Sequence, residues 1–168
     1  MSNFESFGIG GGLISGRTAD SVLEEAVKIA EDLNVEILLM DADMVFGKIH
    51  IESAVEHAAR AFENETNTAT SRMMEVMLYA SGERQLSTAI KKMGIKDKTE
   101  RIAVIVSDSK KLEEVMDSLD IRRDDTVLEG KVENLPAFGI TEKEISSVQK
   151  ERVLDLVLER VALVDLIK

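Results

Sequence analysis

The sequence predicts an α+β fold. We expect one domain over residues 1–168, with a mainly antiparallel sheet of about four strands covered on one side by a layer of about six helices. Short apolar runs typical of buried strands stand at residues 35–40 and 102–106. Two or three amphipathic segments separate these runs, so the strand–helix–strand alternation of a doubly wound parallel sheet is missing. A chain of 168 residues can bury about 70% of its unfolded-chain surface.

A first strand is expected at residues 4–9, followed by a run of glycines at residues 10–12. The run does not match the G-x-G-x-x-G motif of dinucleotide-binding loops, because Leu13 stands where the third glycine is required. The next helix also begins too late, near Ala19, for its N-terminus to hold a pyrophosphate. The glycine run is therefore interpreted as a flexible turn that leaves an edge strand.

The first helix is expected from about Asp20 to Asn34. Thr18 or Asp20 can cap it by accepting hydrogen bonds from its first free N–H groups, and Asn34 is a plausible stop. Its apolar residues at helical spacing are Leu23, Ala26, Val27, Ala30 and Leu33.

Two aspartates follow the second predicted strand and are candidate metal ligands. Asp41 and Asp43 stand at i and i+2, so they point to one side of a strand end and could share a magnesium ion. No glycine-rich phosphate loop and no third carboxylate stands nearby in the sequence. A structural role for Asp43, accepting hydrogen bonds from backbone amides at the following turn, is favoured. A small metal-dependent enzyme that uses Asp41 and Asp43 is the alternative.

The next helix is expected to begin at Lys48 or Ile49, and it carries both histidines. His50 and His57 are seven residues apart, which separates them by about 10.5 Å along a helix axis. They therefore do not chelate one zinc ion. We expect His50 to contact a capping carboxylate such as Asp43.

Residues 67–95 predict two amphipathic helices joined by a tight turn. Ser71 is expected to cap the first helix, Gly82 to end it, and Gly94 to end the second in the same way. The inward positions are Met73, Val76, Met77 and Ala80 in the first helix, and Leu86, Ala89, Ile90 and Met93 in the second.

The last third of the chain predicts two further helices before its end. A short helix follows the caps at residues 107–109, and Thr141 with Glu144 forms a capping box at the start of another. A long terminal helix is expected over residues 148–167. It carries one apolar stripe of Leu154, Val157, Leu158, Val161 and Val164, and a second of Val153, Leu156, Leu163 and Ile167. A surface helix needs only one such stripe, so this helix is either central or meets a partner.

Composition and charge narrow the classes of function. The chain has no cysteine, no apolar run long enough to span a membrane and no secretory signal at its N-terminus, so we expect a cytoplasmic protein. A net charge of −11 disfavours general affinity for nucleic acids. Residues 72–101 nevertheless hold seven cations against four acids, a balance of +3. This segment is either a site for a small anionic ligand or a solvated helix face.

Several residues in sequence order support a resemblance to a known family. The central segment holds Glu75, Leu78, Ser81-Gly82, Arg84-Gln85, Ala89-Ile90 and Gly94-Ile95. The preceding helix contributes Asp43-Met44-Val45, His50, Ala54, His57 and Ala58, and the last helix contributes residues 157–163. Over about residues 35–168, this pattern resembles the TPRKB-type family, the small kinase-binding subunit of the KEOPS complex.

The resemblance implies a non-catalytic regulatory subunit with no cofactor. By this resemblance, family members bind the small lobe of the PRPK-type kinase subunit and are thought to support its ATPase activity. Their complex installs threonylcarbamoyladenosine in tRNA, and the family subunit is thought to hold the single-stranded CCA end. The sequence agrees with a non-enzyme, since it has no G-x-S-x-G motif, no P-loop and no chelating histidine pair.

Two surfaces are candidates for these partners. The tRNA candidates are the cations of the central segment: Arg72, Arg84, Lys91, Lys92 and Lys96, of which only Arg84 lies at a position matched to the family. A three-nucleotide tail offers few phosphates, so a balance of +3 suffices. Base stacking is less well provided for, because only 4% of the residues are aromatic and the chain offers little beyond Tyr79 and Phe46. The kinase candidates are the second stripe of the last helix: Val153, Leu156, Leu163 and Ile167. The alternative is a self-associating acidic domain in which this stripe pairs with itself.

Overall fold

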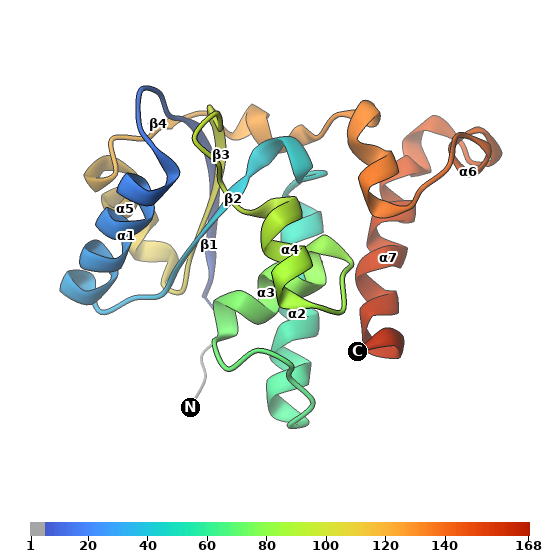
Figure 1. Ribbon diagram of the computed structural model, residues 1–168, viewed down its shortest axis with the longest axis horizontal. Coiled ribbons are helices and arrows are strands. Elements are labelled where there is room, and N and C mark those ends of the chain that lie inside the picture. Colours follow the sequence, from blue (N-terminus) through green and yellow to red (C-terminus); the bar gives the residue numbers. More distant parts are fainter. Residues whose placement is uncertain (1–5) are drawn as a thin grey trace.

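A four-stranded antiparallel sheet runs through the molecule (Figure 1). The computed structural model describes residues 6–168. In these residues the strand order is β2-β3-β1-β4, and every strand pair is antiparallel. The strands are β1 (Gly8–Leu13), β2 (Ile37–Asp41), β3 (Arg101–Val106) and β4 (Arg122–Arg123). The predicted α+β class is confirmed.

The helices lie on both faces of this sheet (Figure 1). One face carries α1 (Ala19–Leu33) and α5 (Leu112–Ser118), and the other carries α2 (Lys48–Glu63), α3 (Arg72–Ser81) and α4 (Leu86–Met93). Beyond α2 and α3 lies α7 (Val153–Ile167), with α6 (Glu142–Ser147) at the far end of the molecule. Short 3₁₀ helices connect them: η1 (Ala42–Met44), η2 (Ser109–Lys111), η3 (Asp125–Glu129), η4 (Val132–Phe138) and η5 (Lys150–Arg152).

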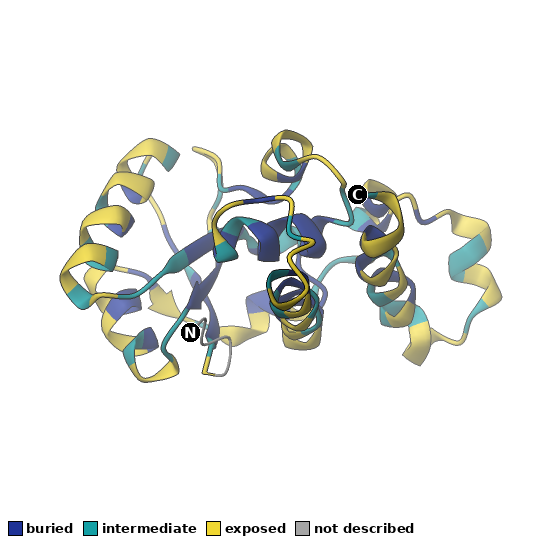
Figure 2. Cartoon of the chain, turned by 90° about the horizontal axis from the view of Figure 1, so that it is seen from below, coloured by how far each residue is buried: buried dark blue, intermediate teal, exposed yellow. Residues whose placement is uncertain are grey.

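The expectation that helices cover only one side of the sheet is wrong. Alternate residues of β3 enter two different cores: Ala103 and Ile105 pack with α2, α3 and α4, whereas Ile102, Val104 and Val106 pack with α1 and α5. A strand that is buried on both faces has a continuous run of apolar residues in its sequence, and residues 102–106 are such a run. Figure 2 shows the resulting buried centre with exposed outer helix faces.

The glycine run forms a strand instead of a turn. β1 occupies Gly8–Leu13 and lies between β3 and β4, so the predictions of a turn and an edge strand are both wrong. Of the predicted strand at residues 4–9, positions 4 and 5 lie outside the described residues. A Cβ atom on Gly11 would lie 2.6 Å from Val127 Cγ2, and one on Gly12 would lie 2.6 Å from the Arg122 carbonyl oxygen. The glycines therefore let η3 and β4 pack directly against the strand backbone.

The predicted helix ends agree with the structure at several positions. Thr18 caps α1 by accepting from Ser21 N at 3.2 Å, and Asn34 ends it with a φ of 53°. Ser71 caps α3, and Gly82 ends it with a φ of 72°. The Thr141–Glu144 capping box is present.

Gly94 does not end α4 in the way that Gly82 ends α3. Its φ is −67°, outside the left-handed region, and it forms an isolated antiparallel bridge with Met40 of β2. The chain leaves α4 in extended conformation because it pairs with the outer edge of the sheet. In residues 6–168, no helix combines the length and apolar character needed to cross a bilayer.

Candidate binding surfaces

His50 is part of the fold and has no exposed surface. Its Nδ1 accepts a hydrogen bond from Phe46 N at 3.0 Å, and its Nε2 donates to the Ala80 carbonyl oxygen at 2.8 Å. Burial lowers the pKa of His50 to about 4, and the hydrogen bond to Ala80 opposes this only in part. The predicted contact with Asp43 is wrong. The neutral imidazole instead ties α2 to the last turn of α3, where carbonyl groups lack helical partners.

The two aspartates after β2 have structural partners. Asp41 Oδ1 accepts from Asp43 N at 3.0 Å, so the amide-holding role predicted for Asp43 belongs to Asp41. Burial is the main reason that the pKa of Asp41 is raised. Asp43 Oδ1 lies 3.3 Å from both Arg101 Nε and Lys131 Nζ. Two cations therefore already balance the charge of Asp43.

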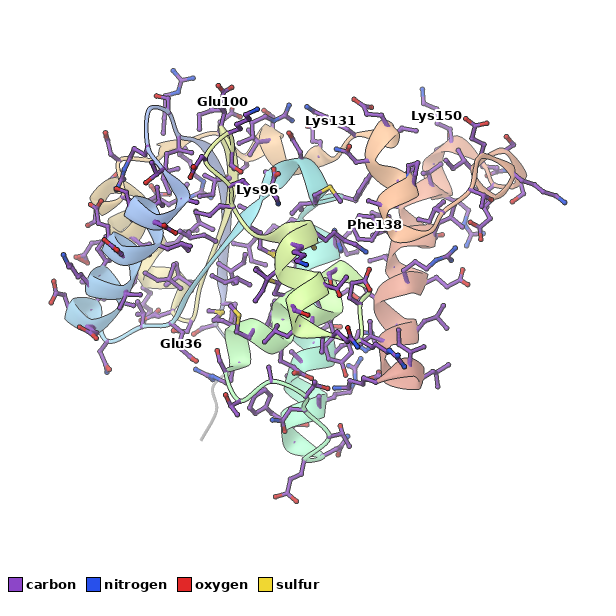
Figure 3. The ribbon with its side chains drawn as sticks, viewed as in Figure 1. Glu36, Lys96, Glu100, Lys131, Phe138 and Lys150 are labelled. Carbon is purple, nitrogen blue, oxygen red and sulfur yellow. The ribbon has the colours of Figure 1, made fainter. Side chains whose placement is uncertain are left out.

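No metal centre is apparent in the described residues, where no three histidine or carboxylate side chains come together. The sequence did not point to Arg101 and Lys131 as partners of Asp43, since both are distant along the chain. In Figure 3, Lys131 lies on the upper side of the molecule, as Lys96 and Glu100 do.

The five predicted tRNA-binding cations do not form one cluster. Arg72 begins α3 and is paired with Glu36, whereas Arg84 follows the other end of that ten-residue helix, about 15 Å away along its axis. Lys92 is largely buried: its Nζ lies 2.6 Å from Glu83 Oε1 and donates to the Ser81 carbonyl oxygen at 2.9 Å.

Three of these cations are exposed and are spread along α4: Arg84 precedes the helix, Lys91 lies in its last turn and Lys96 follows its end. Arg84, Lys91 and Lys96 are exposed, and Lys96 Nζ donates to the Gly94 carbonyl oxygen at 3.0 Å. The two aromatics considered for base stacking are buried, Tyr79 completely and Phe46 to 7% exposure. They do not offer a stacking surface. The assignment of these cations to tRNA stays a prediction.

The predicted kinase-binding stripe of α7 divides between core and surface. Leu156 is buried and Val153 is half-buried against the core, while Leu163 and Ile167 are exposed. Leu166 is 79% exposed and belonged to neither predicted stripe. Leu163, Leu166 and Ile167 together form what we call the apolar end of α7.

Buried polar contacts hold the apolar end of α7 in place. Lys168 Nζ lies 2.6 Å from Glu75 Oε1, and Glu75 also accepts from the backbone N of Thr68 and Ala69. The side chains of Lys168 and Glu75 are 6% and 0% exposed. Lys168 Nζ lies 4.6 Å from the centre of the Tyr79 ring.

A second contact involves Asp165, which accepts a hydrogen bond from the Tyr79 hydroxyl. The same carboxylate lies 3.0 Å from His57 Nδ1, and the His57 ring stacks on Tyr79 at 5.3 Å. Burial is the largest cause of the raised pKa of Tyr79, so its hydroxyl stays protonated. The sequence carries no signal for this network, because its members are brought together only by the packing of α7 on α2 and α3.

A groove of about 330 Å³ runs beside β2. Its walls come from α1 on one face of the sheet and from α3 and α4 on the other. Leu23 and Val27 of α1 were predicted to face the core, but they are 43% and 58% exposed at this groove, while Val22 and Ala26 are buried.

Comparison with known proteins identifies the family. The profile of the family described as "Kinase binding protein CGI-121" matches residues 17–165. The chain is 30% identical over 141 residues to the "Regulatory protein Cgi121" of Methanocaldococcus jannaschii, which covers 82% of this chain and 88% of that protein. The resemblance to the TPRKB-type family is thereby confirmed. The chain belongs to the CGI-121 family of kinase-binding proteins.

Proposed function

We propose that this chain is a non-catalytic regulatory subunit of the KEOPS complex. In this role it binds the PRPK-type protein kinase subunit and the single-stranded CCA end of tRNA during threonylcarbamoyladenosine synthesis. The family description as kinase-binding and the relative's name as a regulatory protein support the kinase partner and the regulatory role. The hydrogen-bond and ion-pair partners of His50, Asp41 and Asp43 within the fold favour structural over catalytic use of these groups.

The observation that carries the kinase assignment is the apolar end of α7. Leu163, Leu166 and Ile167 are 37%, 79% and 47% exposed on a helix whose other side packs in the core. Apolar residues clustered on a rigid element are typical of the centre of a stable subunit interface. The buried Lys168–Glu75 pair keeps this end of the helix ordered, which lowers the entropic cost of binding.

The kinase assignment is tested by co-purification from cells that express this chain with the kinase subunit. The double variant Leu163→Glu/Ile167→Glu is expected to reduce the recovered kinase at least tenfold, because it places two charges in an apolar interface. The variant should remain folded by circular dichroism, since both residues are exposed. Val132→Glu, at a 60% exposed apolar residue on η4, is the matched control. Full recovery of kinase with the double variant would contradict the assignment of the kinase to the apolar end of α7.

The tRNA assignment rests on the exposed cations of the α3–α4 hairpin. A single-stranded tail presents few phosphates, so the three cations Arg84, Lys91 and Lys96 can contribute most of the electrostatic attraction. Lys92 is less suitable for this role because it is committed to Glu83 and the Ser81 carbonyl oxygen.

A gel-shift assay with intact tRNA and tRNA trimmed of its CCA end tests this assignment. The wild-type chain is expected to retain intact tRNA but not trimmed tRNA. The variant Arg84→Glu/Lys91→Glu/Lys96→Glu is expected to retain neither of the two tRNAs. Lys150→Glu, at another exposed lysine, should behave as the wild type. Equal retention of both tRNAs, or unchanged retention by the triple variant, would contradict the assignment.

A further inference from the structure

Helix α7 is apolar on most of its surface. Among residues 153–167, the polar ones are Asp155, Glu159, Arg160 and Asp165. One side of the helix is completely buried at Val157, Val161 and Val164, while the apolar end of α7 stays exposed. Burial of apolar surface is a non-directional force. A helix that is apolar on most sides therefore has no single stripe that selects its inward side.

A small rotation of α7 would exchange buried and exposed apolar residues. Consecutive residues of a helix are separated by about 100° around its axis. Val164 is completely buried, whereas its neighbour Leu163 is 37% exposed. If α7 turned by one residue, Leu163 would take the inward place of Val164, and one aliphatic side chain would replace another in the core. The apolar residues therefore do not decide by themselves which of them face α2 and α3.

Two polar contacts with α3 hold α7 in one orientation. Glu75 of α3 pairs with Lys168 at 2.6 Å. One turn further along α3, the Tyr79 hydroxyl donates to Asp165, which also lies 3.0 Å from His57 Nδ1 of α2. Both residues from the end of α7 thus meet partners that are one turn apart on a single face of α3. We call the Glu75–Lys168 and Tyr79–Asp165 pairs the α3–α7 contacts. Because each depends on direction as well as distance, a rotation of about 100° breaks both.

Breaking the α3–α7 contacts is costly because Glu75 is completely buried. Without Lys168, the carboxylate of Glu75 keeps its hydrogen bonds from the backbone N of Thr68 and Ala69 but loses its cation. Removal of one partner from a buried ion pair is strongly destabilising. Buried polar groups can in this way specify one packing arrangement among several that bury similar apolar surface.

Other polar side chains of α7 do not hold it against α3. Arg160 lies 2.9 Å from Glu144 of α6, and its Nη2 donates to the Gly139 carbonyl oxygen at 3.3 Å. Asp155 lies 2.9 Å from Arg152, three residues earlier. These partners belong to the segment that leads directly into α7. The contacts that orient α7 on the rest of the fold are those at its C-terminal end.

We propose that the α3–α7 contacts set the rotation of α7 about its own axis and thereby select the apolar residues that α7 presents to its partner. Without these contacts, α7 turns toward an orientation that buries Leu163 in place of Val164. The apolar end of α7 is then no longer exposed as one surface. The effect on orientation concerns this chain alone, whereas the effect on kinase binding rests on the proposed function.

Thiol labelling of the full chain measures the orientation of α7. The chain has no cysteine, so a single introduced thiol is the only one that reacts with a maleimide. Val164→Cys places the thiol on the buried side, and Leu163→Cys places it on the exposed side. With the α3–α7 contacts intact, the thiol of Leu163→Cys is expected to react at least tenfold faster than that of Val164→Cys.

The α3–α7 contacts are removed by Glu75→Gln/Tyr79→Phe/Lys168→Met, which leaves the net charge unchanged and no buried carboxylate without its cation. In this triple variant, labelling of Val164→Cys should become at least tenfold faster and labelling of Leu163→Cys at least threefold slower. The slower reaction is decisive, because a loss of stability can only speed the labelling of a thiol.

Leu119→Ala provides the control for a general loss of stability. Leu119 is completely buried in the other core, with α1 and α5, and lies away from α7. In this background, labelling of Leu163→Cys should not slow.

Recovery of the kinase by co-purification tests the second effect. The triple variant is expected to recover at least fivefold less kinase than the wild type, while Leu119→Ala should stay within twofold of it. If Leu163→Glu/Ile167→Glu loses the kinase but the triple variant keeps it, the α3–α7 contacts do not select the surface. If both variants keep the kinase, the proposed docking at the apolar end of α7 is itself wrong.

The proposal is overturned if both thiols react in the triple variant as they do with the contacts intact. It is also overturned if both react faster, because the end of α7 then unfolds instead of turning. If circular dichroism shows that the triple variant is unfolded, Tyr79→Phe takes its place. This single change breaks one of the two contacts and should shift both labelling rates in the same directions by at least twofold, and unchanged rates would overturn the proposal.

Discussion

Helix α3 is held near each of its ends by a completely buried polar side chain, and the two side chains use opposite chemistry. In the first turn, Glu75 is paired with the ammonium of Lys168 from the end of the chain. In the last turn, the Ala80 carbonyl oxygen accepts from a neutral imidazole, that of His50. An ion pair stabilises the fold only while both charges are present, whereas the histidine stabilises it only while uncharged. The two ends of α3 should therefore respond differently to mutation and to pH.

The largest effect is expected from Lys168→Met. This change removes the ammonium but keeps most of the apolar stem, so Glu75 is left without its cation at zero exposure. Removing one partner of a buried pair typically costs about 3–5 kcal/mol. We expect a loss of that size in the free energy of unfolding, measured by urea denaturation.

Lys150→Met provides the control for this measurement, because Lys150 is exposed and its replacement should change the free energy of unfolding by less than about 0.5 kcal/mol. A loss of less than about 1 kcal/mol for Lys168→Met would mean that the end of α7 frays and that hydrogen bonds from Thr68 and Ala69 satisfy Glu75 without the lysine.

The second largest effect that we expect is a loss of stability in mild acid, caused by protonation of His50. Its pKa is lowered from 6.5 to about 4 in the folded chain, so the unfolded chain binds more protons between these values. Stability from the neutral imidazole is therefore complete above pH 6.5 and is lost as the pH falls toward 4. At 1.36 kcal/mol per pKa unit, the difference amounts to about 3 kcal/mol.

Urea denaturation of the wild type and of His50→Gln across this pH range measures the effect. Protonation at Nδ1 would end the hydrogen bond from Phe46 N, so the wild type should lose stability toward pH 4. His50→Gln is less stable at pH 7 and should show a flatter pH dependence. Equal slopes in the two proteins would show that other groups cause the loss in acid.

The sequence predicts contacts between residues close together in the chain, but not long-range contacts such as those at the two ends of α3. Thr18, Asn34, Ser71 and Gly82 act on backbone groups a few residues away, and all four were predicted at these helix ends, Thr18 as one of two candidate caps. The Glu75–Lys168 pair joins residues 93 positions apart, so local patterns carry no signal for it.

The predictions of a turn at the glycine run and of Val27 as a core residue of α1 were wrong for related reasons. Gly11 and Gly12 look like turn residues until Val127 and Arg122 are packed against them. Along α1, Val22 and Val27 are both apolar, and helical spacing does not decide which of them faces the sheet. The candidate site was predicted in outline only: the cations and the α7 stripe were named, but packing decided which of them are exposed.

The smallest effect is expected from Tyr79→Phe, which tests the Tyr79–Asp165 hydrogen bond separately from the Lys168–Glu75 ion pair. The change removes the hydrogen bond to Asp165 but keeps the ring beneath Lys168 and beside His57. Because the Asp165 side chain is 46% exposed, water can replace the lost donor, so we expect a cost of about 1 kcal/mol in urea denaturation. A cost near that of Lys168→Met would mean that Tyr79, Asp165 and Lys168 act as one cooperative unit, and the double variant Tyr79→Phe/Lys168→Met would then be no less stable than either single variant.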